Sequence, residues 1–338
     1  MKPEEATTTI TDVARVAGVS SATVSRYFNG ARVEKRDAIE EAIARLNYRP
    51  SFAARSLKTG RSGVIAVIVP DIKNDFFSAI VQGAESVATD DRMVLLVNTG
   101  DSRKREEKAL DQLLGRVDGV ILAPLTEDEE IPSRFRELGL PLVFVDRVTI
   151  SGAGVSSVIA DNAKGGALAT NHLLDHGHSR IAMIGGPLGT TPGRFRAEGF
   201  YEALRARGVK SSENSFIESD FSEQGGYRSM EHLLRLDSPP TAVFTANNLM
   251  TLGALRLLRD RGVRVPQEIS IIGFDDISTA ELLSPPLTTV ARDAFQQGAL
   301  AMTLMTRLLD EGSSAVVEHS VVDVALVERS SCGPPRSE

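Results

Sequence analysis

The sequence predicts an α/β protein in which a small all-α module precedes a larger core of two lobes built on parallel sheets. Before residue 51 the apolar residues recur at helical spacing, whereas from Gly63 onward apolar strands alternate with amphipathic stretches of 12 to 16 residues. Residues 1–61 contain 11 Lys and Arg against 7 Asp and Glu, a net of +4, so the other 277 residues must carry −11 for the chain to total −7. This asymmetry is expected when only the first module contacts a polyanion.

Length and composition exclude several classes of protein. The chain has 338 residues, 42% of them apolar, which suffices for two or three domains with cores of their own. The single cysteine, Cys332, lies in a polar C-terminal stretch, which excludes a disulfide framework and a cysteine-based metal site and favours a reducing compartment. No apolar signal segment and no run of 18 apolar residues occurs, so we expect a cytoplasmic protein without a membrane partner.

Two short helices are predicted at the start of the basic module. The first lies between Thr9, which can cap its N-terminus, and Gly18, a left-handed stop. Its apolar residues recur at helical spacing at Ile10, Val13, Ala14 and Ala17. The second follows Ser20, a good N-cap residue, and turns Val24 and Phe28 inward.

A third helix and a linker complete this module. Asn29–Gly30 ends the second helix, and the third is expected from about Glu34 to Leu46 before Pro50. Its apolar stripe consists of Ala38, Ile39, Ala42, Ile43 and Leu46. Residues 51–62 have too few apolar residues to fold alone and form the candidate linker, although a partner could induce a helix there.

Repeated βαβ units are predicted after residue 63. The candidate strands are 64–69, 93–98, 119–123, 141–145, 156–160, 180–185, 241–245 and 268–273. The candidate helices are 76–89, 103–115, 162–176, 194–207, 224–236, 248–261 and about 294–310. One large sheet would accommodate these strands, but the break near Asp161 and the late helix favour two lobes that share crossovers.

The segment 9–30 has the composition and spacing of a helix-turn-helix, in which the second helix lies in the DNA major groove. Small Ala14 and Ala17 allow a close helix crossing, and Gly18 makes the tight turn. Ser20 places backbone donors near a phosphate, and Arg26 supplies a bidentate guanine contact. The alternative is an ordinary helical hairpin, but the basic charge of the module favours DNA binding.

Residues 9–58 resemble the headpiece and hinge of the lactose-repressor (LacI/GalR) family of bacterial transcription regulators, through TITDVARVAGVSSATVSR and LNYRPSFAARSLK. The resemblance implies that Ser21, Ala22 and Arg26 read the operator, and that Leu57 enters the minor groove and kinks the duplex. Ser21 and Ala22 are small, so we expect more of the specificity to rest on Arg26. The implied DNA contacts are Thr9, Ser20, Ser21, Ala22, Thr23, Ser25, Arg26, Asn29, Ala54, Leu57 and Lys58.

The connection into the third helix departs from the family pattern. It is about two residues short and lacks the usual Ser or Thr cap. Lys35 and Arg36 stand at this position and are candidate phosphate contacts.

The resemblance continues to about Arg329, with a core similar to periplasmic sugar-binding proteins and their Rossmann-like lobes. It is carried by VPDIKNDFF, LVFVDR, ADNAKGG, HGHSRIAMIGGP, GRFRAEGF, TAVFTANNLMTLGAL, VPQEISIIGFDD and SPPLTTV. The implied organisation is a headpiece at 1–50, a hinge at 51–62, an N-terminal lobe at 63–160 and 293–322, a C-terminal lobe at 161–292 and 323–331, and a tail at 332–338.

The same resemblance implies an effector site between the lobes. The implied contacts are Phe76, Phe77, Asp146, Arg196, Phe221, Asn247, Asp275 and Arg292. Aromatic rings stack on a sugar or a base, carboxylates accept from hydroxyls, and Arg and Asn donate. Each residue also has a structural alternative: Phe76 and Phe77 as core residues, Asp275 as a turn cap, and Arg196 as a solvated helix residue.

Three positions in this set of motifs depart from the family. Asn248 stands where Asp is common, Arg292 where Gln is common, and Asp75 where Pro is common. A cationic Arg292 near Arg196 suggests an anionic effector, such as a sugar phosphate or a sugar acid, held by bidentate pairing.

We expect no cofactor, no metal site and no enzymatic activity. His172 and His176 are four residues apart, but LLDHGH is interpreted as a helix end with Gly177 as the left-handed stop, and no acidic cluster accompanies it. GGPLG at 185–189 lacks the lysine and the spacing of nucleotide-binding loops, and no nucleophile motif occurs.

The resemblance therefore implies a DNA-binding regulator, a repressor that binds a pseudo-palindromic operator as a homodimer and responds to a small effector, a sugar or sugar derivative. No apolar heptad tail follows residue 329, so we expect a dimer and not a tetramer. The alternatives are a cytoplasmic solute-binding protein, a purine-responsive regulator that depends on a corepressor, and an α/β sugar enzyme.

Overall fold

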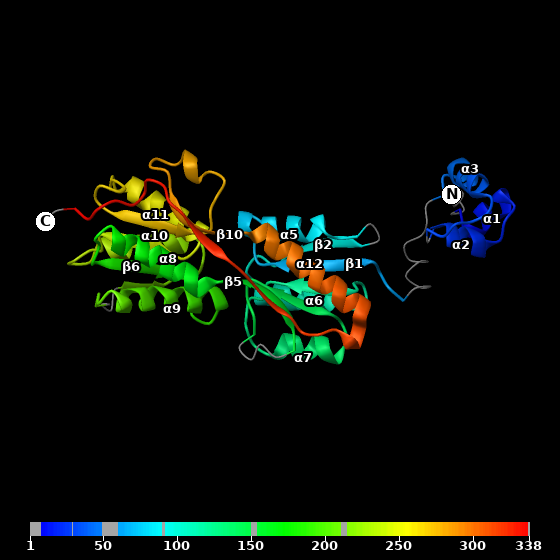
Figure 1. Cartoon of the computed structure of the whole chain (residues 1–338), viewed down its shortest axis with the longest axis horizontal. Coiled ribbons are helices and arrows are strands. Elements are labelled where there is room, and N and C mark those ends of the chain that lie inside the picture. The colour runs from blue at the N-terminus through cyan, green and yellow to red at the C-terminus, as the bar shows by residue number, and fades with distance from the viewer. Residues whose placement is uncertain are drawn as a thin grey trace, which may run out of the picture. The chain divides into compact units, whose positions relative to one another are not determined.

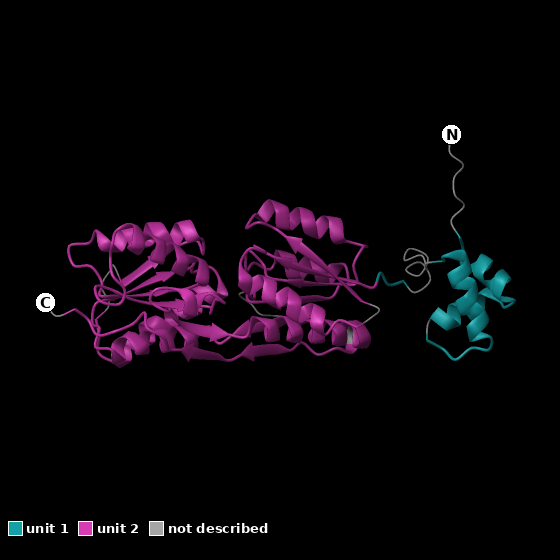
Figure 2. Cartoon of the chain, turned by 90° about the horizontal axis from the view of Figure 1, so that it is seen from above, with its two compact units in different colours: residues 1–62 teal, residues 63–338 magenta. Residues whose placement is uncertain are grey.

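The computed structural model describes residues 8–28, 30–48, 60–89, 92–149, 154–210 and 215–336. The chain divides into two compact units, Met1–Ser62 and Gly63–Glu338 (Figure 2). Most of the linker predicted at 51–62 lies outside the described residues, as do four of the predicted DNA contacts: Asn29, Ala54, Leu57 and Lys58.

Three helices form the first unit: α1 (Ile10–Ala17), α2 (Ser21–Phe28) and α3 (Arg36–Leu46). The predicted caps are confirmed. The Thr9 hydroxyl accepts from the Asp12 amide, the Ser20 hydroxyl accepts from the Thr23 amide at 3.1 Å, and Gly18 has a φ of 62°. The helices enclose a small apolar core whose fully buried members are Val13, Val24 and Ile39.

The connection into α3 is closed by Lys35. This residue has a φ of 59° and no side-chain cap, and its ammonium donates to the Gly18 carbonyl at 3.2 Å. A cation at the C-terminus of α1 interacts favourably with the helix dipole. Arg36 pairs with Glu40 at 2.8 Å. The structure therefore gives both basic residues a partner within the headpiece, and phosphate contact by either stays a prediction.

The second unit contains two six-stranded sheets, one in each lobe (Figure 1). The first sheet has the order β11-β5-β4-β3-β1-β2 and is parallel throughout; its strands are β1 (Val64–Val69), β2 (Met93–Asn98), β3 (Gly119–Leu122), β4 (Leu142–Val145), β5 (Ser156–Ala160) and β11 (His319–Val322). The second has the order β12-β10-β9-β8-β6-β7, with β12 antiparallel to β10; its strands are β6 (Ile181–Gly185), β7 (Phe216–Glu218), β8 (Ala242–Thr245), β9 (Ser270–Phe274), β10 (Thr288–Arg292) and β12 (Val324–Val327). The two-lobed prediction is confirmed, and a single sheet is excluded.

Helices cover both sheets. The first lobe carries α5 (Asp75–Ser86), α6 (Arg103–Leu113), α7 (Glu130–Glu137) and α12 (Ala294–Glu311), and the second carries α8 (Asn162–Asp175), α9 (Thr191–Ala206), α10 (Glu223–Leu234) and α11 (Asn248–Asp260). Two single turns, η2 (Ala280–Leu282) and η3 (Gly312–Ser314), complete the described elements. No described helix is long and apolar enough to cross a bilayer.

The chain passes between the lobes three times, and each passage carries an aspartate. Asp161 caps α8, because its carboxylate accepts from the Lys164 amide, and Asp293 caps α12 in the same manner through Gln296. Asp323 lies between β11 and β12 and pairs with the Lys164 ammonium at 2.5 Å. Two of the three crossings between the lobes are therefore held by helix N-caps, and the third is held by an ion pair.

The sequence analysis placed Cys332 in a polar C-terminal tail, and this prediction is wrong. This residue is 8% exposed, and its thiol contacts the Ile271 carbonyl at 3.3 Å. The neighbouring Gly333 amide donates to the Ser270 hydroxyl at 3.1 Å. Burial raises the pKa of the Cys332 thiol to about 12, so the thiol stays protonated and unreactive. The ordered lobe thus extends past Arg329 along β9.

Candidate functional site

The cavity between the two lobes is formed where strands of both sheets end. Its volume is about 40 Å³. All eight residues that the sequence analysis proposes for the effector line it: Phe76, Phe77, Asp146, Arg196, Phe221, Asn247, Asp275 and Arg292. They come from loops and helix starts after β1, β4, β6, β7, β8 and β9, and from the end of β10. Open α/β sheets place ligands at these strand ends.

Arg292 occupies the centre of this cleft. Its Nη1 donates to Asp146 Oδ1 at 2.5 Å, and its Nε donates to Asp275 Oδ1 at 2.6 Å. The guanidinium lies over the Phe76 ring, 3.6 Å from the ring centre, and the side chain is 3% exposed. Asp146 belongs to the first lobe and Asp275 to the second, so one guanidinium joins both lobes.

The ion pairs decide the charge states of these groups. Burial acts against every charge here, but the carboxylates of Asp275 and Asp146 raise the pKa of Arg292 above its ordinary value. Burial likewise opposes ionisation of Asp146, yet Arg292, Arg147 and Arg196 lower the pKa of Asp146 below its ordinary value. Arg292 and Asp146 are therefore ionised at neutral pH.

Arg196 is buried, which excludes the solvated helix residue considered as an alternative. It is 1% exposed, and its Nε donates to Asn162 Oδ1 at 2.8 Å while Nη1 donates to the Ala246 carbonyl. The guanidinium lies 3.5 Å from the centre of the Phe274 ring. Its buried Nη2 has no hydrogen-bond partner among the described residues. Burial, followed by the charge of Arg292, lowers the pKa of Arg196 to about 9, so the site holds a cation short of anionic partners.

Four lining residues have left-handed backbone conformations that favour glycine. The φ angles are 53° at Asp101, 68° at Asp146, 60° at Phe221 and 72° at Asp275. Such conformations at residues other than glycine cluster at ligand sites, where the surrounding structure holds them. Each residue follows a strand end and turns its side chain into the cleft.

Further contacts hold the two lobes together. Asn248 Nδ2 donates to Asn74 Oδ1 across the cleft at 2.8 Å. The carboxylate of Glu127, 4% exposed, accepts from the Thr191 hydroxyl at 2.5 Å at the start of α9 and pairs with Arg194 at 3.3 Å. The lobes are therefore closed, and the small cavity lies far below the roughly 300 to 1,000 Å³ of ligand pockets.

The sequence analysis missed several residues that line the cavity. Arg147 is 7% exposed and donates to the Pro124 carbonyl at 3.0 Å, while its buried Nε makes no hydrogen bond within the described residues. The sequence could have indicated Arg147 as a lining residue, because it directly follows Asp146 at the end of a buried strand. The other missed lining residues are Asp71, Asn74, Asp101, Pro192 and Leu249.

The helix-turn-helix presents the surface expected of a DNA reader. Ala22 and Arg26 are exposed on α2, and Ser21, Thr23 and Ser25 are half-buried on the same helix. The Arg26 guanidinium has no ion-pair partner in the part of the chain that the structure describes. Base contact by Arg26 and its neighbours on α2 stays a prediction.

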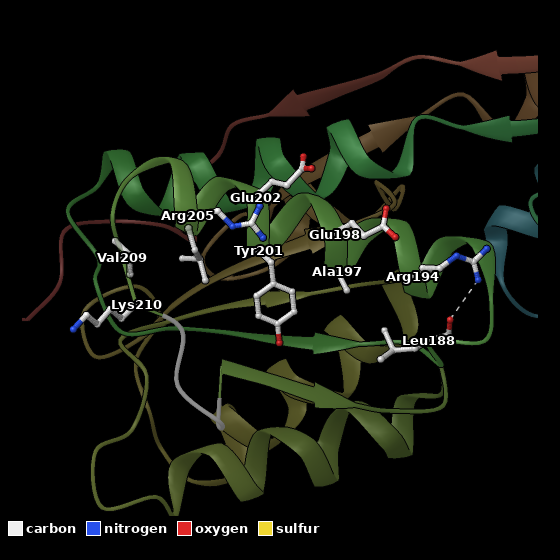
Figure 3. Close-up of a pocket in the computed structure, with 10 residues that line it drawn as sticks. Leu188, Arg194, Ala197, Glu198, Tyr201, Glu202, Arg205, Val209 and Lys210 are labelled. Atoms are coloured by element: carbon white, nitrogen blue, oxygen red, sulfur yellow. Dashed lines mark hydrogen bonds between the residues drawn. The ribbon is translucent and has the colours of Figure 1, made fainter.

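A second hollow, of about 860 Å³, lies along α9 on the outer face of the second lobe (Figure 3). Its charged residues are exposed except the half-buried Arg194, whose guanidinium extends to the Leu188 carbonyl at 3.5 Å. None of the eight proposed effector residues lines this hollow. The polar groups that are buried and aimed at one point belong to the cleft between the lobes.

Comparison with known proteins agrees with this architecture. Residues 9–51 match the model of bacterial regulatory proteins of the lacI family, and residues 170–332 match a periplasmic binding protein-like domain. The chain is 38% identical over 306 residues to the ribose operon repressor of Escherichia coli (strain K12), covering 88% of this chain and 92% of the relative. It is 37% identical over 321 residues to the HTH-type transcriptional repressor PurR of Pasteurella multocida (strain Pm70), covering 92% of this chain and 95% of the relative.

Solved structures show the same likeness over the whole chain. The lac repressor dimer bound to operator and the anti-inducer ONPF superposes with a TM-score of 0.84 at 31% identity, covering 96% of this chain and 98% of that one. Both the helix-turn-helix and the two-lobed core lie within these matches. The chain therefore belongs to the lacI family of bacterial regulatory proteins.

Proposed function

We propose that this protein is a transcriptional repressor that binds a pseudo-palindromic operator as a homodimer and is controlled by a small effector held between its lobes. The observation that carries the proposal is the pairing of two sites on one chain, an exposed α2 surface with Arg26 and a buried polar cleft built around Arg292. Binding at the cleft changes DNA affinity through a coupling free energy of roughly 1 to 3 kcal/mol. A repressor acts where the operator is, which places the protein in the cytoplasm.

The homodimer is supported by the exposed edge of the first sheet. Strand β2 is the edge strand, and its residues Met93, Leu95 and Leu96 are 55%, 38% and 39% exposed. An apolar edge strand left in water invites pairing with another chain. Two copies joined here would present two copies of α2, which fits a palindromic operator.

The effector is proposed to carry hydroxyl groups and one negative charge. Three buried guanidinium groups line the cleft, from Arg147, Arg196 and Arg292, against two buried carboxylates, from Asp146 and Asp275. Asp71 and Asp101 also line it but are more exposed. Arg196 Nη2 and Arg147 Nε make no hydrogen bond within the described residues, although Arg147 Nε lies 3.8 Å from Asp146 Oδ2, and acceptor oxygens of a ligand would satisfy these donors.

Calorimetric titration of matched neutral and anionic sugars tests whether the effector carries a negative charge. We expect D-ribose 5-phosphate or another sugar phosphate to bind more tightly than the corresponding neutral sugar, because an anion satisfies the excess buried positive charge. A purine base serves as the third ligand, since it tests the alternative of a purine-responsive regulator. A preference for the neutral sugar contradicts the anionic effector, and a preference for the purine favours that alternative.

Titration of the full chain onto DNA tests the proposed function. We expect a selected operator to bind more tightly than random DNA, with affinity that falls steeply as salt rises, because phosphate contacts release counterions. Sedimentation of the complex should give two chains for each operator. Absence of DNA binding by the dimer would refute the repressor and favour a cytoplasmic solute-binding protein.

A further inference from the structure

A cluster of two histidines and one glutamate lies on the second lobe, away from the cleft. His172 lies in the last turn of α8 and His176 is its C-cap residue, while Glu328 follows β12, which packs against that helix. One ligand atom from each side chain lies within 4.8 Å of the other two. The sequence analysis interpreted the histidines as part of a helix end without an acidic cluster, and the fold supplies a glutamate from more than 150 residues away in sequence.

His172 is the member that lacks an explanation. It is 7% exposed, yet its Nε2 has no hydrogen-bond partner among the described residues. The neighbouring His178 shows what a structural histidine does: its Nδ1 contacts the Thr241 hydroxyl at 2.8 Å and its Nε2 contacts the Gly333 carbonyl at 2.8 Å. A buried ring nitrogen without a partner loses the hydrogen bonds that it had with water, so it points to a missing ligand.

We propose that His172, His176 and Glu328 bind a divalent transition-metal ion of the zinc class. Two imidazoles and one carboxylate form a set of three ligands that suits Zn²⁺, with a fourth position left for water. Histidines four residues apart share one helix face. A tetrahedral ion with bonds of about 2 Å draws its ligands to about 3.3 Å from one another, and the exposed Glu328 and half-buried His176 have the freedom to approach.

The two histidines pack against each other beside a hollow that opens to solvent. The rings of His172 and His176 meet edge to face with centres 4.8 Å apart. The cluster borders a hollow of about 370 Å³ that also includes the carboxylate of Asp175, so an ion can enter from solvent.

A bound ion would tie α8 to the strand that returns from the first lobe. The opposite end of α8 reaches the effector cleft, where Asn162 accepts from Arg196. Arg329, next to Glu328, pairs with Asp276 at 2.8 Å beside the cleft residue Asp275. The ion would thus join the far ends of α8 and β12, two elements that begin at the cleft, since Val324 pairs with Arg292, and the site needs no effector to form.

Calorimetric titration of the full chain with ZnCl₂ tests the site, on protein purified without a histidine tag. We expect one Zn²⁺ for each chain and tetrahedral absorption bands when Co²⁺ replaces it. Glu328→Gln and His176→Asn alter half-buried or exposed side chains and should weaken binding by at least about tenfold, since even outer partners of metal ligands cost that much. His232→Ala, which removes an exposed histidine from α10 of the same lobe, is the matched control.

The results distinguish a specific metal site at these three residues from its absence. Loss of binding in both cluster variants with an unchanged His232→Ala protein supports the assignment. No binding of Zn²⁺ by the wild-type chain, or unchanged affinity in either cluster variant, overturns it. Thermal unfolding of each variant without metal checks that the fold is intact, and DNA binding is measured separately because the metal site stands or falls independently of the repressor function.

Discussion

Replacing Arg292 with glutamine is expected to destabilise the core by roughly 3 to 5 kcal/mol, because removal of one partner from a buried ion pair leaves an uncompensated charge. Asp146 and Asp275 are 3% and 6% exposed, and Arg292 is the cation that contacts both. The loss also removes the guanidinium that joins the lobes across the Phe76 ring. Urea unfolding of the wild type and of the Arg292→Gln protein measures the difference in free energy.

Arg256→Gln is the matched control for this change. Arg256 pairs with Glu223 at 3.3 Å, but the two side chains are 59% and 49% exposed, so we expect less than about 1 kcal/mol. Combining Arg292→Gln with Asp275→Asn should recover part of the loss, since the double variant removes one of the stranded charges. Equal losses of unfolding free energy in Arg292→Gln and Arg256→Gln would show that the buried ion pairs contribute no more to stability than an exposed one.

Acid should weaken the wild-type core through the same ion pairs. The pKa of Asp146 is lower in the folded protein than its ordinary value of 3.8. A lowered carboxyl pKa stabilises the fold above the ordinary value, and this contribution disappears as the pH falls toward the folded-state pKa. The Arg292→Gln protein should lose this part of the acid dependence.

Arg26→Ala is expected to weaken operator binding by about 2 to 6 kcal/mol for the dimer, because a bidentate contact to guanine contributes roughly 1 to 3 kcal/mol at each half-site. Ser21 and Ala22 on the same face of α2 are too small to replace it. Fluorescence anisotropy with an operator selected from random DNA, and with an unrelated duplex, measures both affinities. The loss should fall mainly on the operator.

Arg45→Ala provides the matched control for Arg26. Arg45 is exposed on α3, so its removal takes one positive charge from the headpiece without touching α2. We expect a small loss that is similar for the operator and for the unrelated duplex. If Arg26→Ala weakens both duplexes equally, Arg26 contacts phosphate and does not read bases.

The elements that the sequence predicted well have strong local signals. Strands β1 and β2 have the expected bounds, because apolar residues form unbroken runs from Val64 to Val69 and from Met93 to Val97. Among the missed elements, α7 contains Pro132 in its first turn, and β10 and β11 are short segments that include polar residues. Strand β12 is apolar throughout but has only four residues. Pairing of β10 with β9 and β12, and of β11 with β5, supplies the stability that the local sequence does not indicate.

The sequence by itself determined the helix-turn-helix and the two lobes, because these depend on periodicity, on caps and on the alternation of apolar strands with helices. The eight cleft residues that were predicted came from the family resemblance of motifs at strand ends. Only the tertiary structure decided how Arg292 is used. A guanidinium that the sequence suggested as a partner for an anionic effector instead pairs with Asp146 and Asp275 and closes the lobes. The tertiary structure also brings Glu328 close to His172 and His176, since contact between segments so distant in sequence depends on the packing of β12 against α8.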